Sequence, residues 1–427
     1  MKVFKFGGAS VKDAAAVENV ARILKLYPKQ DMVVVISAMA KTTNALEEVL
    51  ALYRRGDSGL AAMVDEIRAF HEAILVELAI PGDEVRVIVQ QLFEELQSRL
   101  EREPSDNPDF DYDQIVSYGE LLSTVIVSAY LRACGVAAHW VDARRLVRTD
   151  NRYREARVNW SKTTELVNSS WTALLEGRKG KGPVVMLTQG FIGHTDEYVT
   201  TTLGREGSDF TAAILAYALG AESVSIWKDV PGVLNADPKY FKDAVLLKRI
   251  SYREAIELAY YGASVIHPKT IKPLQNKGIV LYVRSFLEPQ SEGTTIESST
   301  FSDSLVPSFI FKVKQVLISF TPRDFSFVAE DNLSELFRIF AERQIKIHLM
   351  QNSAINFSIC VDYDDQKLNA VLNDCKVRYE VLYNAPCELV TIRHYDQDTI
   401  SRLLIGKKVL VEQKSRSTAR MVLVEQA

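Results

Sequence analysis

The chain has 427 residues, of which 47% are hydrophobic and 25% charged, so it is expected to be globular in about two or three domains, not disordered or fibrous. The formal net charge of −4 leaves no basic surplus for a phosphate backbone or an anionic membrane, and nucleic acid is not expected as a partner.

The first residues read as strand, glycine turn and helix, and a second unit of the same kind follows. The expected elements are a strand at Lys2–Phe6, a helix at Asp13–Lys25, a strand at Met32–Ile36 and a helix at Thr42–Arg54. Strands that alternate with helices predict a parallel sheet covered on both faces.

The next segments are mainly helical before the strands resume. The helical pattern runs from Gly59 to Glu103 with a break at Pro81-Gly82, and Gln114–Cys134 is a further long helix that contains Glu120. Short apolar strands return at Pro183–Leu187 and Ser223–Trp227, with a helix at Ser208–Leu219 between them. We expect a cap of helices and then a continuation of the sheet.

Ser285–Ser308 is rich in Ser, Thr, Glu and Pro and is typical of a linker or an edge connection, so we place a domain boundary there. The segments beyond it predict a strand, a helix and two strands at Phe311–Phe320, Leu333–Gln344, Ile345–Leu349 and Ile355–Asp362. That order is typical of a small α+β module.

The four cysteines form no C-x-x-C pair and share no metal-like spacing with the six histidines, so reduced, packed thiols are expected. The apolar N-terminal stretch is interrupted by Lys5, unlike a secretory signal, and no stretch reaches the roughly 18 apolar residues of a membrane span. The expected location is the cytoplasm.

Three motifs could carry chemistry. In the first, Lys5 ends a strand and is followed by Gly7-Gly8, whose backbone N–H groups can hold an anion at a helix start. The sequence is not that of a Walker-type loop, and a strand followed by two glycines is often only a structural turn.

The second motif is Leu203-Gly204-Arg205-Glu206-Gly207-Ser208-Asp209. Arg205 between glycines suits bidentate binding of a carboxylate. The alternative is that Ser208 or Asp209 serves only as the cap of the following helix.

The third motif, Trp227–Lys239, follows a strand with Pro-Gly and Asp-Pro turn signals. Such turns are usually only turns, but ligands of open parallel sheets bind beyond the carboxyl ends of strands.

Together these motifs resemble those of the aspartate kinases within the amino-acid kinase superfamily. Three blocks match in order: K-F-G-G-[TS]-S at Lys5–Ser10, S-A-x-x-x-x-T-[ND]-x-L at Ser37–Leu46, and L-G-R-G-G-S-D at Leu203–Asp209. Weaker similarity covers Gly119–Ser123, Asp142–Tyr153 and Asp229–Pro238, and the resemblance runs from about Lys2 to Ile296.

The resemblance implies a three-layer α/β amino-acid kinase fold over residues 1–296 that transfers a phosphoryl group from ATP to the side-chain carboxylate of L-aspartate. This reaction opens the route to lysine, threonine and methionine. The implied substrate residues are Ser37, Thr43, Glu120, Arg205 and Ser208. Arg205 would bind the α-carboxylate and Glu120 the ammonium, although Glu120 alone would be read as a solvated helix residue and Thr43 as a helix cap.

The resemblance also implies Lys5 and Asp209 as the catalytic pair and Mg²⁺-ATP as the second substrate. The metal would be held mainly by the phosphates, with help from Asp209 and no direct protein site. The implied ATP residues are Lys5, Gly7, Gly8, Lys228, Asp229, Leu234, Lys239 and Ser264.

Three positions depart from the family pattern. Ala9 replaces a hydroxyl residue, Glu206 replaces a glycine beside Arg205, and Ser264 stands where the family usually has a lysine that contacts the nucleotide. Lys228 is a candidate to replace that lysine.

Residues 297–427 resemble ACT modules, α+β ferredoxin-like domains that bind an amino-acid effector and pair subunits into a homodimer or larger homo-oligomer. The first module would span Phe311–Asp374, and Glu388–Val424 is short for a complete second one. His348 lies where lysine-sensitive members often carry an acidic group, so the resemblance does not extend to lysine feedback.

Two other readings remain open at this point. The chain is either a kinase for a related substrate, such as glutamate, N-acetylglutamate or a nucleoside monophosphate, or an inactive kinase-like sensor of amino acids. Glu120 and the Leu203–Asp209 block favour aspartate, and joint retention of Lys5, Arg205 and Asp209 favours an active enzyme.

Overall fold

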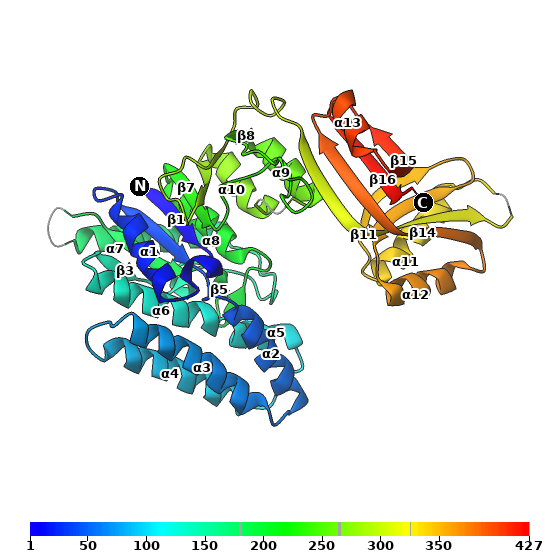
Figure 1. Cartoon of the computed structure of the whole chain (residues 1–427). Coiled ribbons are helices and arrows are strands. Elements are labelled where there is room, and N and C mark those ends of the chain that lie inside the picture. The colour runs from blue at the N-terminus through cyan, green and yellow to red at the C-terminus, as the bar shows by residue number, and fades with distance from the viewer. Residues whose placement is uncertain (179–181, 264–265, 325, 427) are drawn as a thin grey trace. The chain divides into compact units, whose positions relative to one another are not determined.

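The computed structural model describes residues 1–178, 182–263, 266–324 and 326–426, and these residues form two compact units (Figure 1). Unit 1 comprises Met1–Val233, Leu246–Ile256 and Ile266–Thr300. Unit 2 comprises Leu234–Val245, Glu257–Val265 and Phe301–Ala427. Unit 2 therefore includes two segments that precede its main part in the sequence.

Unit 1 is built on an eight-stranded sheet within its described residues, in the order β3-β4-β2-β1-β7-β9-β10-β8. The strands are β1 (Lys2–Phe6), β2 (Met32–Ile36), β3 (Ala138–Trp140), β4 (Val185–Gln189), β7 (Ser223–Lys228), β8 (Arg249–Ser251), β9 (Val280–Ser285) and β10 (Thr294–Glu297). Neighbouring strands are parallel except β9 and β10, which confirms the predicted mainly parallel sheet. A separate antiparallel pair is formed by β5 (Ile192–His194) and β6 (Thr200–Thr202).

Helices cover both faces of this sheet, which is why β2 is buried along its whole length. The helices α1 and α6 pack together on one face, and α8 packs with α7 and α10 on the other (Figure 1). Their bounds are α1 (Ala14–Lys25), α2 (Thr42–Arg55), α3 (Leu60–Glu77), α4 (Glu84–Leu100), α5 (Pro108–Val116), α6 (Tyr118–Ala133), α7 (Trp160–Glu176), α8 (Gly207–Leu219), α9 (Tyr252–Tyr261) and α10 (Pro268–Lys277), with short 3₁₀ turns η1 (Gly8–Val11) and η2 (Ala143–Arg145).

Two sequence predictions differ from these elements. The single helix expected at Gln114–Cys134 is in fact α5 followed by α6, and α5 begins earlier because the Asn107 side chain accepts the N–H groups of Asp109 and Phe110. The segment predicted as a linker, Ser285–Ser308, contains β10, which lies inside the sheet between β9 and β8.

The stretch that forms α5 and α6, Pro108–Ala133, is long and apolar enough to cross a membrane, with a mean hydropathy of 1.2. In the structure 83% of its most apolar window is buried inside the protein. Burial against the sheet and α4 accounts for this composition, so the stretch reads as core helix.

Unit 2 contains a six-stranded antiparallel sheet in its described residues, in the order β12-β13-β11-β14-β16-β15. The elements are β11 (Ser308–Pro322), α11 (Glu330–Glu342), β12 (Ile347–Asn352), β13 (Phe357–Asp362), α12 (Asp365–Cys375), β14 (Tyr379–Arg393), α13 (Gln397–Leu403), β15 (Lys407–Lys414) and β16 (Thr418–Glu425). The predicted strand, helix, strand and strand of the first module are all present.

The long strands β11 and β14 each serve two modules. Their pairing shifts register near Lys312 and Gln315, and the halves beyond that shift complete a βαββαβ module with α11, β12, β13 and α12. The other halves, Ser308–Lys312 and Leu389–Arg393, join α13, β15 and β16. The short C-terminal segment thus forms a second module, because β11 and β14 extend into it from the first module.

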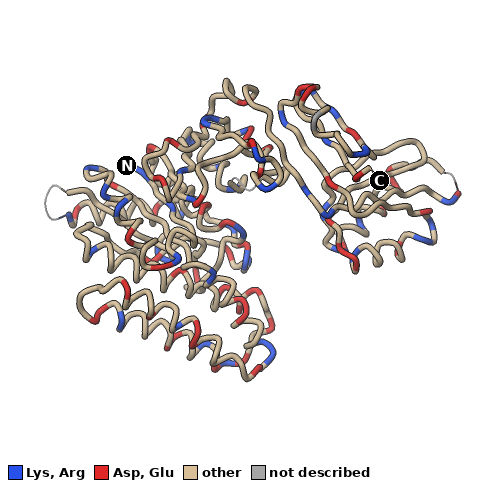
Figure 2. The backbone as a smooth tube through the Cα atoms, in the orientation of Figure 1, with Lys and Arg blue, Asp and Glu red and all other residues tan. Residues whose placement is uncertain are grey.

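The second module has one helix of its own, and the segment Leu234–Val245 covers part of its sheet. Phe241 stacks on Phe309 with ring centroids 4.9 Å apart, and Ala236 lies in the same apolar cluster. A segment from the middle of the chain therefore completes the core of unit 2. Lysine, arginine and acidic residues are interspersed along both units (Figure 2).

Candidate active site

The carboxyl ends of β1, β2 and β7 lie side by side because the three strands are parallel and in register, with Phe6 opposite Ile36 and Trp227. A cavity of about 640 Å³ opens at this edge. Eight of the residues predicted from the sequence line it: Lys5, Ser37, Thr43, Glu120, Arg205, Ser208, Asp209 and Lys228. The three motifs thus meet in one site, although the first and the third are more than two hundred residues apart in the chain.

Lys5 and Asp209 form a buried ion pair at the floor of this cavity. The Lys5 Nζ lies 2.7 Å from Asp209 Oδ1, and the two residues are only 9% and 3% exposed. A buried pair of this kind is weak evidence for stability, because desolvation of both charges offsets their attraction. It does fix the lysine ammonium at the edge of the cavity.

The N-terminus of α8 faces the same cavity. The helix is capped by Glu206 in the left-handed conformation, and Ser208 and Asp209 lie in its first turn. Neither Ser208 nor Asp209 is the cap, so that structural alternative is wrong. First-turn N–H groups and the helix dipole make this end suited to an anion.

The structure shows how Glu206 is accommodated at the position where the family pattern has a glycine. Its φ of 53° is a conformation that glycine adopts without cost, and the side chain instead gains a hydrogen bond in which Glu206 Oε2 accepts the His267 N–H at 2.8 Å. Beside it, Lys269 Nζ donates to the Leu203 carbonyl at 2.7 Å. The glutamate carboxylate is therefore held against the α10 cap, and Arg205 remains exposed.

Glu120 is a buried carboxylate with few hydrogen-bond partners. It is 3% exposed, and Oε1 accepts the Ala38 N–H at 3.3 Å while Oε2 has no hydrogen-bond partner among the described residues. Burial raises the pKa of Glu120 to about 8, and the Ala38 N–H and Lys5 offset only part of that rise. Glu120 lines the cavity, and its orphaned oxygen is suited to a ligand ammonium. The sequence reading of Glu120 as a solvated helix residue is wrong.

The loop after β2 is fixed by backbone contacts. The Ser37 N–H donates to Phe6 O at 3.1 Å, and Ser123 Oγ donates to Ser37 O at 2.7 Å. The cap of α2 is Lys41, so Thr43 lies in the first turn and is not the N-cap. Its side chain lines the cavity.

The residues predicted for ATP are more scattered. Gly7 adjoins the Lys5 ammonium, since a Cβ added there would lie 3.3 Å from Nζ. Asp229 lines a second cavity of about 1150 Å³ with Ala9. Leu234 and Lys239 belong to the segment of unit 2 described above, and Ser264 lies outside the described residues.

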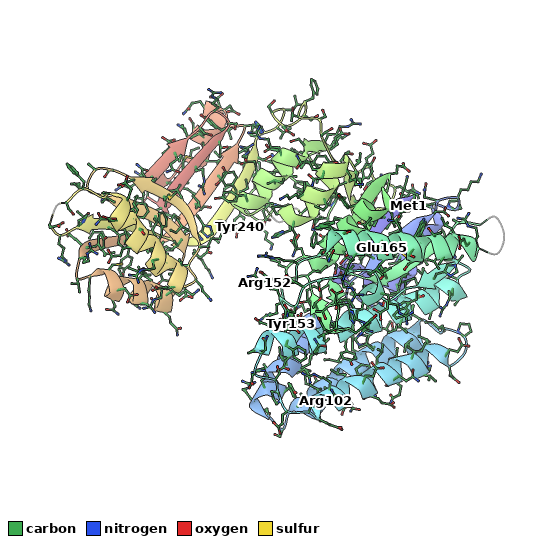
Figure 3. The ribbon with its side chains drawn as sticks, turned by 180° about the vertical axis from the view of Figure 1, so that it is seen from behind. Met1, Arg102, Arg152, Tyr153, Glu165 and Tyr240 are labelled. Carbon is green, nitrogen blue, oxygen red and sulfur yellow. The ribbon has the colours of Figure 1, made fainter. Side chains whose placement is uncertain are left out.

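Five further residues that line the 640 Å³ cavity were not predicted from the sequence, namely Glu47, Tyr112, Arg154, Glu155 and Phe191. Arg154 and Glu155 directly follow the Asp142–Tyr153 stretch, whose end at Arg152 and Tyr153 is labelled in Figure 3. The helix start at Asn107-Pro108 was the available signal for Tyr112. Among the described residues, no group of three His, Cys, Asp or Glu side chains could hold a metal ion.

The chain matches known proteins over nearly all of its length. A profile of the amino acid kinase family matches residues 1–285. Lysine-sensitive aspartokinase 3 of Escherichia coli is 34% identical over 360 residues, which are 84% of this chain and 78% of that protein. Chloroplastic aspartokinase 1 of Arabidopsis thaliana is 31% identical over 373 residues, 84% of this chain and 63% of that longer protein.

Two crystal structures of Escherichia coli aspartokinase III are similar along the whole chain, each at 30% identity. The lysine and aspartate complex has a TM-score of 0.83 and covers 100% of this chain and 96% of that one. The aspartate and ADP complex has a TM-score of 0.79 and covers 99% and 96%.

The chain belongs to the amino acid kinase family and, within it, to the aspartokinases. It is an ATP-using kinase that phosphorylates aspartate, the first step of the pathway to the aspartate-derived amino acids. The mainly parallel sheet and the ACT-like C-terminal unit predicted from the sequence are confirmed. The inactive sensor is not favoured.

Proposed function

We propose that the 640 Å³ cavity binds L-aspartate and presents its side-chain carboxylate to the terminal phosphate of ATP. The observation that carries this proposal is the convergence of Arg205, the orphaned Glu120 oxygen and the Lys5–Asp209 pair on one cavity. Arg205 binds the α-carboxylate with help from the first turn of α8 and Ser208. Glu120 binds the ammonium, and Ser37 and Thr43 orient the side-chain carboxylate.

The chemical step requires no general base. The side-chain carboxylate of free aspartate has a pKa near 4, so it is ionised at neutral pH and attacks phosphorus directly. Lys5 then lies where negative charge gathers on the transferring oxygens, and Asp209 holds its ammonium in place. Catalysis here is positioning and charge neutralisation.

We place the triphosphate beside Lys5 and the Gly7-Gly8 backbone, with Lys228, Asp229, Leu234, Lys239 and Ser264 as the remaining nucleotide residues. Mg²⁺ supplies charge neutralisation across the phosphates and keeps several water ligands. Asp209 would help to place the metal indirectly, since its buried carboxylate is paired with Lys5.

The test is hydroxamate formation from aspartate, Mg²⁺-ATP and hydroxylamine by the purified protein, with Lys5→Met as the variant. We expect kcat to fall by about 100-fold or more, since the charge that the lysine neutralises is largest in the transition state. Lys2→Met is the matched control, because Lys2 lies on the same strand but does not line the cavity, and its ion pair is with exposed Glu222 at 3.9 Å. Full activity of Lys5→Met, or hydroxamate formed equally with glutamate or N-acetylglutamate, would contradict the proposal.

We also propose that residues 297–427 regulate the enzyme, binding an amino-acid effector and pairing chains into a homodimer or larger homo-oligomer, and that the enzyme works in the cytoplasm. The His348 side chain is nearly buried and its Nε2 lies 2.9 Å from Asp362 Oδ2, so Asp362 is already engaged. A lysine ammonium would meet this occupied pair instead of a free carboxylate.

We therefore expect lysine to inhibit this enzyme weakly if at all, unlike its lysine-sensitive relative. The measurement is aspartokinase activity at saturating aspartate with lysine, threonine and methionine added separately. Strong inhibition by lysine alone would show that the His348–Asp362 pair does not exclude it.

A further inference from the structure

Asp113 in α5 is a fully buried carboxylate whose partners are all neutral donors. Its exposed fraction is 0%, and it accepts the Arg154 N–H at 3.0 and 3.1 Å and the Thr202 N–H at 2.9 Å. The Thr202 hydroxyl donates a further hydrogen bond at 2.6 Å. Within the described residues Asp113 has no ion-pair partner, so these bonds alone stabilise its charge. Hydrogen bonds to a buried charge are stronger than those between neutral groups.

The first segment tied by Asp113 carries Arg154. Its φ of 66° is unfavourable for a residue with a side chain, and the two contacts to Asp113 hold the backbone there. The guanidinium stacks on Tyr112 at 4.1 Å, and both side chains line the cavity. Its ion pair with Asp109 is half-exposed and 3.4 Å long, so it is weak and leaves the guanidinium available to an anion.

The second segment tied by Asp113 leads to Arg205. Thr202 is the last residue of β6, and the loop Leu203–Asp209 follows it directly. Gln114, the neighbour of Asp113, also donates to the Thr200 carbonyl at 2.8 Å. Both ends of β6 are therefore hydrogen-bonded to α5, and this fixes the point at which the Arg205 loop begins.

We propose that Asp113 is a positioning residue that clamps these two segments so that Arg154 and Arg205 face one anionic ligand, and that Arg154 is a second guanidinium for the carboxylates of aspartate. This inference rests on the proposed placement of aspartate in the cavity. Two guanidinium groups suit a substrate that carries two carboxylates, and Arg154 lines the cavity together with the residues proposed to bind aspartate.

Asp111 provides the matched comparison. It lies two residues earlier on the same helix and is also fully buried, but it is paired with Arg54 and, at 2.7 Å, with Arg99. Neither arginine lines the cavity. Asp111 therefore ties helices together, whereas Asp113 ties segments of the cavity wall.

The experiment compares Asp113→Asn and Asp111→Asn in the full-length enzyme by steady-state kinetics and thermal unfolding. Asp113→Asn is expected to raise KM for aspartate by about tenfold, because one acceptor oxygen becomes a donor, and to change KM for ATP by less than about twofold. Asp111→Asn is expected to lower Tm without that change in KM. Arg154→Ala should also raise KM for aspartate. The double variant Asp113→Asn/Arg154→Ala should have a KM for aspartate close to that of the more affected single variant, because both changes act on the same contact.

Thr202→Val removes only the hydroxyl and should raise KM for aspartate less than Asp113→Asn does. This variant keeps the test decisive if Asp113→Asn does not fold. Its control is Thr201→Val, which instead loses the hydrogen bond between the Thr201 and Thr149 hydroxyls. Unchanged KM for aspartate in Arg154→Ala and in both clamp variants overturns the inference. A wild-type enzyme that forms no aspartyl hydroxamate would overturn the proposed function instead.

Discussion

The two buried carboxylates of this site, Asp209 and Glu120, differ in their partners. Asp209 is buried beside Lys5 and forms an ion pair with it in a place where water has little access. Glu120 is equally buried but has only one backbone donor, and its pKa is raised to about 8 as a result. The Lys5–Asp209 pair is complete within the protein, whereas one oxygen of Glu120 has no partner among the described residues.

The raised pKa of Glu120 predicts a pH dependence with a definite sign. Below pH 8 the empty site holds Glu120 protonated, so KM for aspartate should fall as pH rises from 7 to 9, where the ionised carboxylate attracts the ammonium. Glu120→Gln should have a high KM without this pH dependence. Steady-state kinetics at several pH values measures both.

The same shift has a consequence for stability. The folded pKa lies above the ordinary value of 4.5, so the native state binds the extra proton and loses this contribution as pH rises towards and through about 8. The gain in Tm of Glu120→Gln over wild type should be larger at pH 9 than at pH 5. Glu18→Gln is the control for the removal of a carboxylate from an exposed position, on the outer face of α1. Equal gains at both pH values would contradict the shifted pKa.

Most of the site was accessible from the sequence because its residues sit in contiguous motifs at strand ends. Lys5 and Ser37 lie at the carboxyl ends of neighbouring parallel strands, and Arg205 was placed with them by the resemblance to the aspartate kinases. Arg154 and Asp113 could not, because a left-handed backbone at Arg154 and a carboxylate shared with Thr202 depend on contacts between segments distant in the chain. Burial of Glu120 was also invisible to helical periodicity, since α6 is apolar on nearly all sides.

At the scale of elements, the site depends on how closely two loops approach. The turn at Gly8 after β1 lies against the loop after β2, where the Ala40 N–H donates to Gly8 O at 3.1 Å. A Cβ at Gly8 would lie 2.8 Å from Ala40 O and 2.9 Å from Ala38 O, which are backbone atoms that cannot rotate away. Gly8 is thus required for the close packing of these two loops.

Gly8→Ala should therefore push the two loops apart and misplace Lys5 relative to Ser37 and Thr43. We expect kcat to fall by at least about tenfold, since small displacements of reacting groups are costly. Gly182→Ala is the control, because a Cβ there meets nothing within 4 Å. Normal kinetics of Gly8→Ala would show that the loops separate without moving the site.

The elements themselves were predictable to different degrees. Strands β1 and β2 and helix α1 were found because short apolar runs and helical spacing are strong signals over those lengths. The strand β10 was missed because its four residues, Thr294–Glu297, are set by pairing with β8 and β9 and not by apolar content.

At the scale of the whole molecule, the division into units does not follow the sequence. The segments Leu234–Val245 and Glu257–Val265 precede the last strands of unit 1 but belong to unit 2. There the Glu257 carboxylate lies 3.8 Å from the Arg393 guanidinium, and Arg420 lies over the Tyr261 ring at 5.0 Å. Linear motifs could not reveal this, because the boundary predicted near residue 296 assumes one crossing between domains.

The stacking of Phe241 on Phe309 predicts that the second ACT-like module depends on the first of these segments. Phe241→Ala should destabilise unit 2 by about 2 kcal/mol through lost apolar burial. Phe327→Ala is the control, since Phe327 is 74% exposed in the same unit. Chemical denaturation followed by limited proteolysis of unit 2 measures the difference, and equal stability of the two variants would count against the role of this segment.

The interleaving of the units also constrains how such an enzyme can be rearranged by recombination. A gene cut after Thr300 yields one product that carries Phe241 without Phe309 and another that carries Phe309 without Phe241. A regulatory unit acquired from a relative would have to bring three separate stretches of chain at once. Point substitution, rather than exchange of one contiguous segment, is therefore the open route by which unit 2 of this chain could change.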